Sequence, residues 1–167
     1  IAVGLGIAFQ LMLWATLHVP TIFLFLFPPM MLLFIAPERL GVAGFDFADS
    51  EAAYPPSLYR GLAAKLRGAG IPLTVHSGEE GHHRMVSETR DSLGPRRIGH
   101  GVRVADDPTG RLLERIKAEA VLIETNPWSN YLTHAVESVE KHPLPLFFRA
   151  GARVSIGADD PEILDTD

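Results

Sequence analysis

The stretch Thr74-Val75-His76-Ser77-Gly78-Glu79 closes the short apolar run of residues 71–75 and adds a histidine and a carboxylate to it. Such a run predicts a buried strand, and the Ser-Gly pair predicts a sharp turn because glycine adopts unusual backbone dihedrals without steric cost. The strand would therefore present an imidazole at its end, and the turn would bring a carboxylate back beside it. This arrangement is typical of a metal ligand next to a general acid or base. The plainer interpretation is a strand-end histidine with a solvated glutamate.

Three later stretches repeat this pattern of polar groups after an apolar run. They are Arg97-Ile98-Gly99-His100-Gly101, residues 124–130 (ETNPWSN) and residues 154–161 (VSIGADDP). In a parallel sheet or barrel the carboxyl ends of all strands lie on one face, where such folds build active sites. The four stretches together therefore predict one site rather than separate surface features.

Strand and helix signals alternate from residue 40 onward. Short strands are predicted at residues 42–45, 71–75, 97–98, 120–123 and 153–156. Helices are predicted after Pro55-Pro56, around residues 85–93, after Asp107-Pro108, and at residues 131–140 and 144–150. Leu58, Leu62 and Leu66 would share one face of the first helix, and Asp107 would be the N-cap of the third. This alternation predicts an α/β fold with a parallel sheet and right-handed crossovers.

The motifs, taken in order, resemble those of the adenosine deaminase family of metal-dependent amidohydrolases. The family pattern reads roughly G-x-D-L-A-G-x-E, H-A-G-E, R-x-G-H-G, C-P-x-S-N and S-x-x-x-D-D-P. Its counterparts are residues 44–51, 76–79, 97–101, 126–130 and 155–161, and the resemblance covers about residues 41–167. It implies that residues 38–167 form a truncated (β/α)8 TIM-type barrel, about its last five βα units. Because a complete barrel needs about 250 residues, we expect the chain to be a fragment without the first strands and the C-terminal tail.

The resemblance also implies roles for the residues at the strand ends. His76 and Asp159 would be zinc ligands, and Asp159 would also orient the attacking water. Glu79 would donate a proton to the ring nitrogen beside the carbon under attack, which requires a partly buried carboxyl group. His100 would hydrogen-bond the attacking hydroxide, and Asp160 would contact a purine ring nitrogen. Without the other motifs, the Asp-Asp-Pro sequence would equally predict a turn or a helix N-cap.

Two further aspartates are candidate substrate-binding residues, namely Asp46 and Asp49. The family often has glycine at the position of Asp49, where its backbone contacts the purine, so an aspartate adds a side chain and a charge there. The expected substrate is a 6-aminopurine, with adenosine first and adenine or aminodeoxyfutalosine as alternatives. A non-catalytic relative that binds purines is a further alternative.

The ligand set for zinc is incomplete in this sequence. The family's first strand carries His-x-His, whose two imidazoles face the same way because a strand has a period of two. No counterpart of this motif occurs here. Two protein ligands bind zinc weakly compared with the usual three or four. We therefore expect one Zn2+ per site, with the remaining ligands outside this chain, and no turnover by the chain alone.

The composition excludes several other classes of protein. The 167 residues carry a net charge of −5 and no basic stripe, which argues against nucleic-acid binding through phosphates. The chain has no cysteine, which excludes disulfide scaffolds, cysteine-based zinc sites and the P-C-x-x-C class of nucleic-acid deaminases. The resemblance implies a small-molecule partner, a purine nucleoside or base. A cytoplasmic location is expected, with membrane association through residues 1–37 as the alternative.

Residues 1–37 differ from the rest because no Asp, Glu, Lys or Arg occurs before Glu38. Hydropathy alone predicts a membrane segment. However, Pro20 and Pro28-Pro29 divide the segment into pieces of marginal length, and a positive signal-peptide start is missing. Three interpretations stay open: a membrane anchor, buried barrel elements, or a segment that is not native to the domain. The third is favoured slightly.

The remaining histidines are weaker candidates for the site. His82 and His83 are expected at a solvated helix start, and His134 and His142 on the surface of helices. His18 has no second histidine two residues further on. None of them is assigned a role.

Overall fold

The computed structural model describes residues 41–48, 50–51 and 53–165 of the chain. The chain divides into two compact units, residues 1–43 and 44–167, and the fold below is that of the second. Within these described ranges, no helix has the length and apolar character needed to cross a membrane. The apolar segment 1–37, with its three interpretations, lies outside the described residues.

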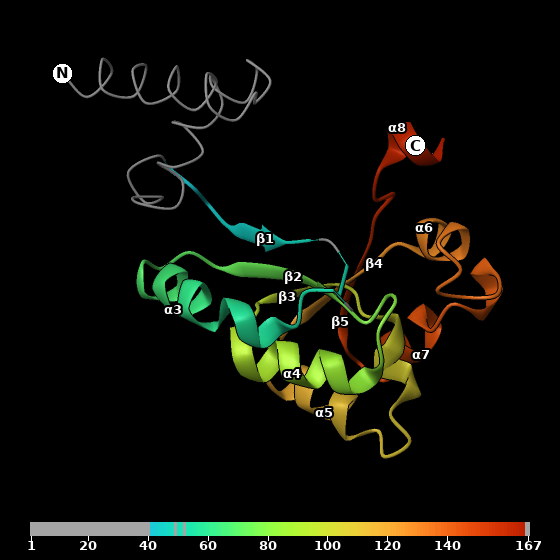
Figure 1. Cartoon of the computed structure of the whole chain (residues 1–167). Coiled ribbons are helices and arrows are strands. Elements are labelled where there is room, and N and C mark those ends of the chain that lie inside the picture. The colour runs from blue at the N-terminus through green and yellow to red at the C-terminus, as the bar shows by residue number, and fades with distance from the viewer. Residues whose placement is uncertain (1–40, 49, 52, 166–167) are drawn as a thin grey trace. The chain divides into compact units, whose positions relative to one another are not determined.

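Five strands form one parallel sheet whose spatial order follows the chain (Figure 1). They are β1 (Phe45–Phe47), β2 (Leu73–Ser77), β3 (Arg97–His100), β4 (Leu122–Thr125) and β5 (Arg153–Ile156). His76 on β2 lies opposite Gly99 on β3, which in turn lies opposite Glu124 on β4. Parallel neighbours require crossover connections, and helical segments provide them. The predicted α/β fold with a parallel sheet is confirmed.

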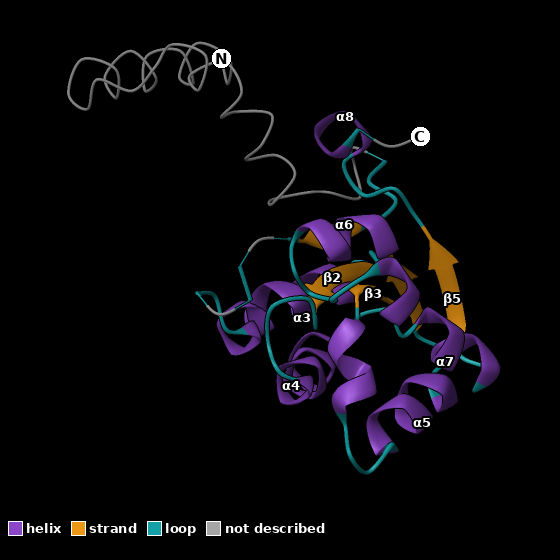
Figure 2. Ribbon diagram, turned by 90° about the vertical axis from the view of Figure 1, so that its right-hand side faces the viewer, coloured by secondary structure: helices purple, strands orange, loops and turns teal. Residues whose placement is uncertain are grey.

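Helical segments connect the strands, and α3, α4 and α5 lie along one face of the sheet (Figure 1). The segments are η2 (Pro56–Tyr59), α3 (Arg60–Gly68), α4 (His83–Leu93), η3 (Val102–Asp106), α5 (Arg111–Ala118), α6 (Pro127–Leu132), η4 (Val139–Lys141), α7 (Leu144–Arg149) and α8 (Pro161–Leu164). Figure 2 shows α4, α5 and α7 below the strands. This layering matches one part of a barrel wall, with helices on the outside.

The main hydrophobic core fills the space between the sheet and these helices. Ile98 and Ile123 from the sheet pack with Val86, Ile116 and Phe147 from the helices, and all five side chains are fully buried. Burying a side chain of this size stabilises the fold by about 1.5–3 kcal/mol relative to exposure. The core therefore holds the strands in place from the helical side.

Alternation along β2 decides which face of the sheet carries polar groups. Leu73, Val75 and Ser77 are buried, whereas Thr74 and His76 are only partly buried. Successive side chains of a strand point to opposite faces. His76 therefore points away from the helices, toward the face that lies inside a barrel.

The strand that carries His76 differs slightly from its predicted extent. β2 begins at Leu73 and continues through Ser77, so His76 lies within the strand rather than after it. The chain turns only at Gly78, whose φ of +80° favours glycine. The turn thus starts one residue later than the sequence suggested, and Glu79 follows it directly.

The region after β4 departs further from the prediction. Residues 127–130, which precede the predicted helix at residues 131–140, begin α6, with Pro127 in its first turn. The predicted helix over residues 131–140 is wrong, because α6 ends at Leu132 and His134 has a φ of +63°. Only the short η4 forms in the remainder of that range. The motif residues of this stretch therefore lie on a rigid helical turn.

Two local predictions on the helices also need correction. Leu58 is 67% exposed, because the residues after Pro55 form the 3-10 helix η2 and do not continue the α-helical face of Leu66. The residue that precedes α5 is Gly110 rather than Asp107. Asp107 still accepts hydrogen bonds from the backbone N–H groups of Leu112 and Thr109, which lower its pKa to about 2.

Candidate active site

Polar side chains at or after the carboxyl ends of all five strands line one pocket of about 400 Å³. Among the lining residues are His76, Glu79, His100, Asp159 and Asp160. The sequence predicted that these groups lie at the carboxyl ends of parallel strands, and the sheet brings those ends to one edge. The pocket therefore brings together imidazole and carboxylate side chains from three separate motifs.

His76 stands on the open side of this pocket. Its Nε2 atom lies 3.5 Å from Oδ2 of Asp46, and 28% of its side chain is exposed. The hydrogen bond with Asp46 raises the pKa of His76, although partial burial opposes the shift. A Cβ on Gly99 would lie 2.7 Å from Cδ2 of His76. Glycine at this position thus makes room for the imidazole ring.

His100 lies deeper, and its backbone is strained. The residue is 2% exposed and has a φ of +65°, a region that non-glycine residues rarely adopt. Its Nε2 atom lies 3.4 Å from Oε2 of Glu79 and 4.0 Å from Oδ2 of Asp159. Its ring meets that of His76 edge to face, with centroids 4.8 Å apart. Such strain is concentrated at functional sites, where the surrounding structure maintains it.

The turn that carries Glu79 is held by a second carboxylate, that of Glu51. This carboxylate accepts hydrogen bonds from the backbone N–H groups of Gly78, Glu79 and Glu80, at 2.7, 2.8 and 3.2 Å. It also accepts one from the Ser77 hydroxyl at 3.3 Å. Glu51 is 8% exposed, so these bonds form away from solvent. They fix the backbone from which the Glu79 side chain projects.

The side chain of Glu79 is oriented by two donors. Its Oε1 atom accepts hydrogen bonds from Nδ2 of Asn130 at 3.1 Å and from the Thr133 hydroxyl at 2.8 Å. Asn130 is fully buried and also contacts His142, which is 4% exposed. The prediction that His142 lies on the surface is therefore wrong. Its place behind Asn130 follows from the short α6, which returns the chain toward the sheet.

Asp159 and Asp160 diverge at the end of β5. Asp159 has a φ of +64°, and its Oδ2 atom accepts a hydrogen bond from the Ser129 hydroxyl at 2.7 Å. Asp160 precedes α8 but makes no side-chain cap hydrogen bond there. Both residues line the pocket. The Asp159 carboxylate is therefore held by Ser129 of α6, whereas that of Asp160 does not cap α8.

A family model with the description "Adenosine deaminase" matches residues 31–167. The chain belongs to the adenosine deaminase family. An adenine deaminase from Aspergillus fumigatus is 40% identical over 124 residues, which are 74% of this chain and 34% of that protein. An adenosine deaminase from Enterococcus faecalis is 37% identical over 129 residues, which are 77% of this chain and 37% of that protein.

Solved structures of this family have the same fold. The structure of an adenine deaminase from Arthrobacter aurescens superposes with a TM-score of 0.69 at 33% identity, over 74% of this chain and 37% of that one. An amidohydrolase from Burkholderia ambifaria, described with bound zinc, gives a TM-score of 0.66 at 25% identity, over 75% of this chain and 35% of that one. The chain thus spans about a third of the length of its relatives. The predicted partial barrel is confirmed.

The family implies a metal, and the described residues supply part of a ligand set. His76 and Asp159 offer a ring nitrogen and a carboxylate, donors that suit zinc, and both line the pocket. Over residues 41–48, 50–51 and 53–165, no group of three or more His, Cys, Asp or Glu side chains is arranged to hold a metal ion. Zinc sites use three or four protein ligands. The residues present therefore fit part of a zinc site without completing it.

The remaining predicted site residues have different outcomes. Asp46 lies beside His76, and its predicted contact with substrate stays a prediction. Asp49 lies outside the described residues. Glu51, Asn130 and His142 received no role from the sequence, although the first two fall within family motifs. A signal was present for Glu51, because an acidic residue that ends a motif is rarely needed for packing alone.

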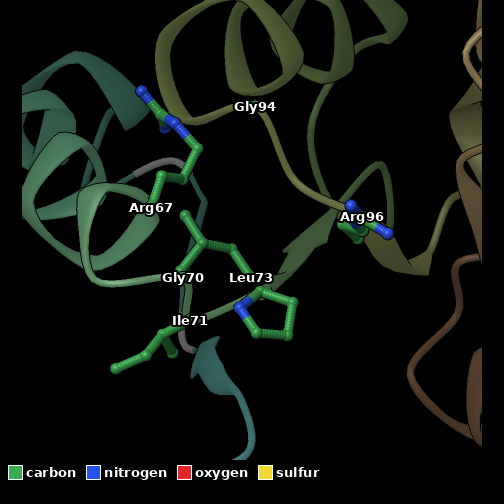
Figure 3. A pocket seen from close by; sticks show the side chains of 7 residues that line it. Arg67, Gly70, Ile71, Leu73, Gly94 and Arg96 are labelled. Carbon is green, nitrogen blue, oxygen red and sulfur yellow. The ribbon is translucent and has the colours of Figure 1, made fainter. Parts of the chain in front are cut away.

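A second pocket, of about 410 Å³, lies at the opposite ends of β2 and β3 (Figure 3). Its polar lining includes Arg67 and Arg96, and Arg67 donates a hydrogen bond to the backbone carbonyl of Leu93. In barrels of this type the amino-terminal face serves stability, whereas the carboxyl-terminal face carries catalysis. The pocket around His100 is therefore the candidate active site.

Proposed function

We propose that this protein catalyses the zinc-dependent, hydrolytic deamination of a 6-aminopurine, with adenosine as the first candidate substrate. The observation that carries the proposal is the meeting of three side chains from different strand ends. Nε2 of His100 lies 3.4 Å from Oε2 of Glu79 and 4.0 Å from Oδ2 of Asp159. An acid, a hydrogen-bond donor and a carboxylate are thereby concentrated at one side of a pocket with room for a small molecule.

In the proposed reaction, the oxygen of a water molecule bonds to C6 of the purine ring. Glu79 donates a proton to the adjacent ring nitrogen, and one proton of the water passes through the Asp159 carboxylate to the amino group. The bond from C6 to the amino nitrogen then breaks, ammonia leaves, and the proton of the new hydroxyl at C6 returns to Glu79. A positioned general acid contributes about 10²–10⁴-fold to such a step. His100 donates a hydrogen bond to the attacking oxygen, and Asp160 binds a nitrogen at the far side of the ring.

Zinc dependence is part of the proposal. His76 and Asp159 would contribute two ligands, together with donors outside the described residues, and zinc would supply acidification of the attacking water. The support is the family membership and the zinc described in the Burkholderia amidohydrolase. A loss of activity on chelation, restored by added Zn2+, is the expected result.

Adenine is the second candidate substrate. The 40%-identical relative from Aspergillus and the 33%-identical structure from Arthrobacter are both named adenine deaminases. The two substrates differ by the ribose, so the space beside the purine decides between them. A comparison of kcat/KM for adenosine and adenine separates the two candidates.

The test is an ammonia-release assay on the protein expressed from its complete reading frame. Adenosine, adenine and aminodeoxyfutalosine are offered in turn, in water enriched in oxygen-18. We expect ammonia from one of them and the heavy oxygen at C6 of the product. Absence of ammonia from all three, with zinc bound, would contradict the proposed function.

A further inference from the structure

The amide of Asn130 is the link between the two candidate proton carriers of the site. It is fully buried, and its Nδ2 atom lies 2.9 Å from Nδ1 of His100 and 3.1 Å from Oε1 of Glu79. Its Oδ1 atom lies 3.2 Å from Nε2 of His142. An amide nitrogen only donates hydrogen bonds and an amide oxygen only accepts them. The direction of this one amide therefore constrains three neighbouring side chains.

His142 determines that direction. Its Nδ1 atom accepts a hydrogen bond from the backbone N–H of Leu144 at 3.0 Å, so that nitrogen carries no hydrogen. Burial, with a smaller effect from His100, lowers the pKa of His142 to about 4, so the ring is neutral at neutral pH. A neutral imidazole that accepts at Nδ1 carries its hydrogen on Nε2. This N–H can only donate to the oxygen of Asn130, which turns the amide nitrogen toward the pocket.

We propose that Asn130 is a positioning residue that sets which atoms of His100 and Glu79 present hydrogen to the pocket. Because Nδ2 of Asn130 donates to Nδ1 of His100, that nitrogen accepts, and the ring hydrogen of His100 resides on Nε2. Nε2 is the nitrogen that faces Glu79 and Asp159. His100 is thereby fixed as a hydrogen-bond donor toward the reacting groups. The role in catalysis rests on the proposed function, but the position of the hydrogens does not.

The same amide also makes the two carboxylate oxygens of Glu79 unequal. Oε1 already accepts two hydrogen bonds, one from Asn130 and one from Thr133. Two donors occupy the lone pairs of a carbonyl-type oxygen. Oε2 is therefore the oxygen that remains free to hand a proton to a substrate, and it is also the one nearer to His100. A reversed amide would place Oδ1 of Asn130 against Oε1, two acceptors in contact, and would move the hydrogen of His100 to Nδ1.

The first test measures the tautomers in the 167-residue chain itself. Histidine labelled with nitrogen-15 gives distinct ring-nitrogen shifts for each tautomer in long-range proton–nitrogen spectra. We expect His100 and His142 both to carry their hydrogens on Nε2. Wild-type His100 with its hydrogen on Nδ1 would overturn the inference, whether or not the protein has deaminase activity.

Variants then test whether Asn130 is the cause. Asn130→Asp replaces the donor by an acceptor of the same shape, so the hydrogen of His100 should move to Nδ1. His142→Gln keeps a donor for Asn130 and should preserve the wild-type tautomer, whereas His142→Leu should not. His134→Gln, an exposed histidine beyond α6, is the matched control and should change nothing at His100. An unchanged His100 spectrum in folded Asn130→Asp would contradict the inference.

The catalytic consequence is measured on the protein from the complete reading frame. We expect kcat to fall about 100-fold in Asn130→Asp and about tenfold in His142→Leu, because a preorganised donor is lost. KM should change by less than about threefold, since neither residue is expected to touch the substrate. The single variant His142→Gln should keep kcat within about threefold of wild type. A fall in stability with unchanged kcat would show a merely structural role and overturn the assignment.

Discussion

The two sides of the pocket are built in different ways. On the side formed by His100, Asn130 and Glu79, His100 is 2% exposed and Asn130 is fully buried, and each of the three side chains has a hydrogen-bond partner within the chain. On the side formed by His76 and Asp46, His76 keeps 28% of its side chain exposed, and its Nε2 atom pairs with Asp46, of which 51% is exposed. One side is closed by hydrogen bonds, and the other is open.

The contrast separates two tasks of the site. Buried, fully bonded polar groups are rigid and hold their hydrogens in fixed places, which suits proton transfer and hydrogen-bond donation. A partly exposed imidazole whose ring nitrogen has only a long contact to Asp46 can rearrange when a further ligand arrives, which suits metal binding. The closed side should therefore be sensitive to changes of hydrogen-bonding type, and the open side to changes of space around His76.

The largest effect is expected when Glu79, the general acid on the closed side, is replaced. Glu79→Gln keeps the shape of the side chain but cannot deliver a carboxyl proton, so kcat/KM for the 6-aminopurine should fall about 1000-fold, or ~4 kcal/mol. Steady-state ammonia release by the complete protein measures this. Glu88→Gln, an exposed position on α4, is the control and should retain full activity. Equal losses in the two variants would remove Glu79 from the mechanism.

The open side is tested by filling the space beside His76. In Gly99→Ala the new Cβ would lie 2.7 Å from Cδ2 of His76, so the ring must move. Affinity of the complete protein for zinc should fall about 10–100-fold, as it does when a ligand is misplaced. Gly61→Ala on α3, which meets no atom within 4 Å, should leave zinc binding unchanged. Competition with a chelator measures both, and unaltered zinc affinity in Gly99→Ala would show that His76 is no ligand.

A smaller effect, on stability, is expected when Glu51, which anchors the turn that carries Glu79, is replaced. Glu51→Gln leaves one oxygen to accept from the backbone N–H groups of Gly78, Glu79 and Glu80 and places an NH2 group against the others. The free energy of unfolding should fall by about 2 kcal/mol, the cost of unsatisfied buried donors. Urea unfolding of the 167-residue chain measures it, and Glu88→Gln should stay within about 0.5 kcal/mol of wild type. A similar value for both variants would mean that the turn does not need Glu51.

The sequence predicted much of this architecture because its signals are local. Apolar runs indicated all five strands, although β1 lies at Phe45–Phe47 rather than residues 42–45 and β4 at Leu122–Thr125 rather than residues 120–123. Glycine also marked a helix end, as at Gly94 after α4. The site residues at strand ends followed from the parallel arrangement. The anchoring of the turn by Glu51 and the burial of His142 could not be predicted, because their partners lie 26 to 29 and 12 residues away. Such contacts depend on tertiary packing, which a local pattern does not encode.

The smallest expected effect is on the pH dependence of stability, to which His142 on the closed side and His76 on the open side contribute in opposite directions. Burial, more than the nearby His100, lowers the pKa of His142 from its ordinary value of 6.5 to about 4. Between pH 6.5 and 4 the imidazole is protonated in the unfolded chain but neutral in the folded chain. The contribution of His142 to the free energy of unfolding therefore falls by about 1 kcal/mol as the pH is lowered from about 7 to 5.5. His76 acts in the opposite sense: Asp46 raises its pKa, so its stabilisation is present below pH 6.5 and is lost as the pH rises through the folded value.

Urea unfolding of wild type and His142→Gln at several pH values isolates the first effect. The difference in free energy of unfolding between the two proteins should shrink by about 1 kcal/mol as the pH falls from about 7 to 5.5, because glutamine binds no proton. The term from His76 is common to both proteins and cancels. A difference that does not change with pH would mean that His142 is protonated as easily in the folded chain as in the unfolded one, and the closed side of the pocket would then be open to water.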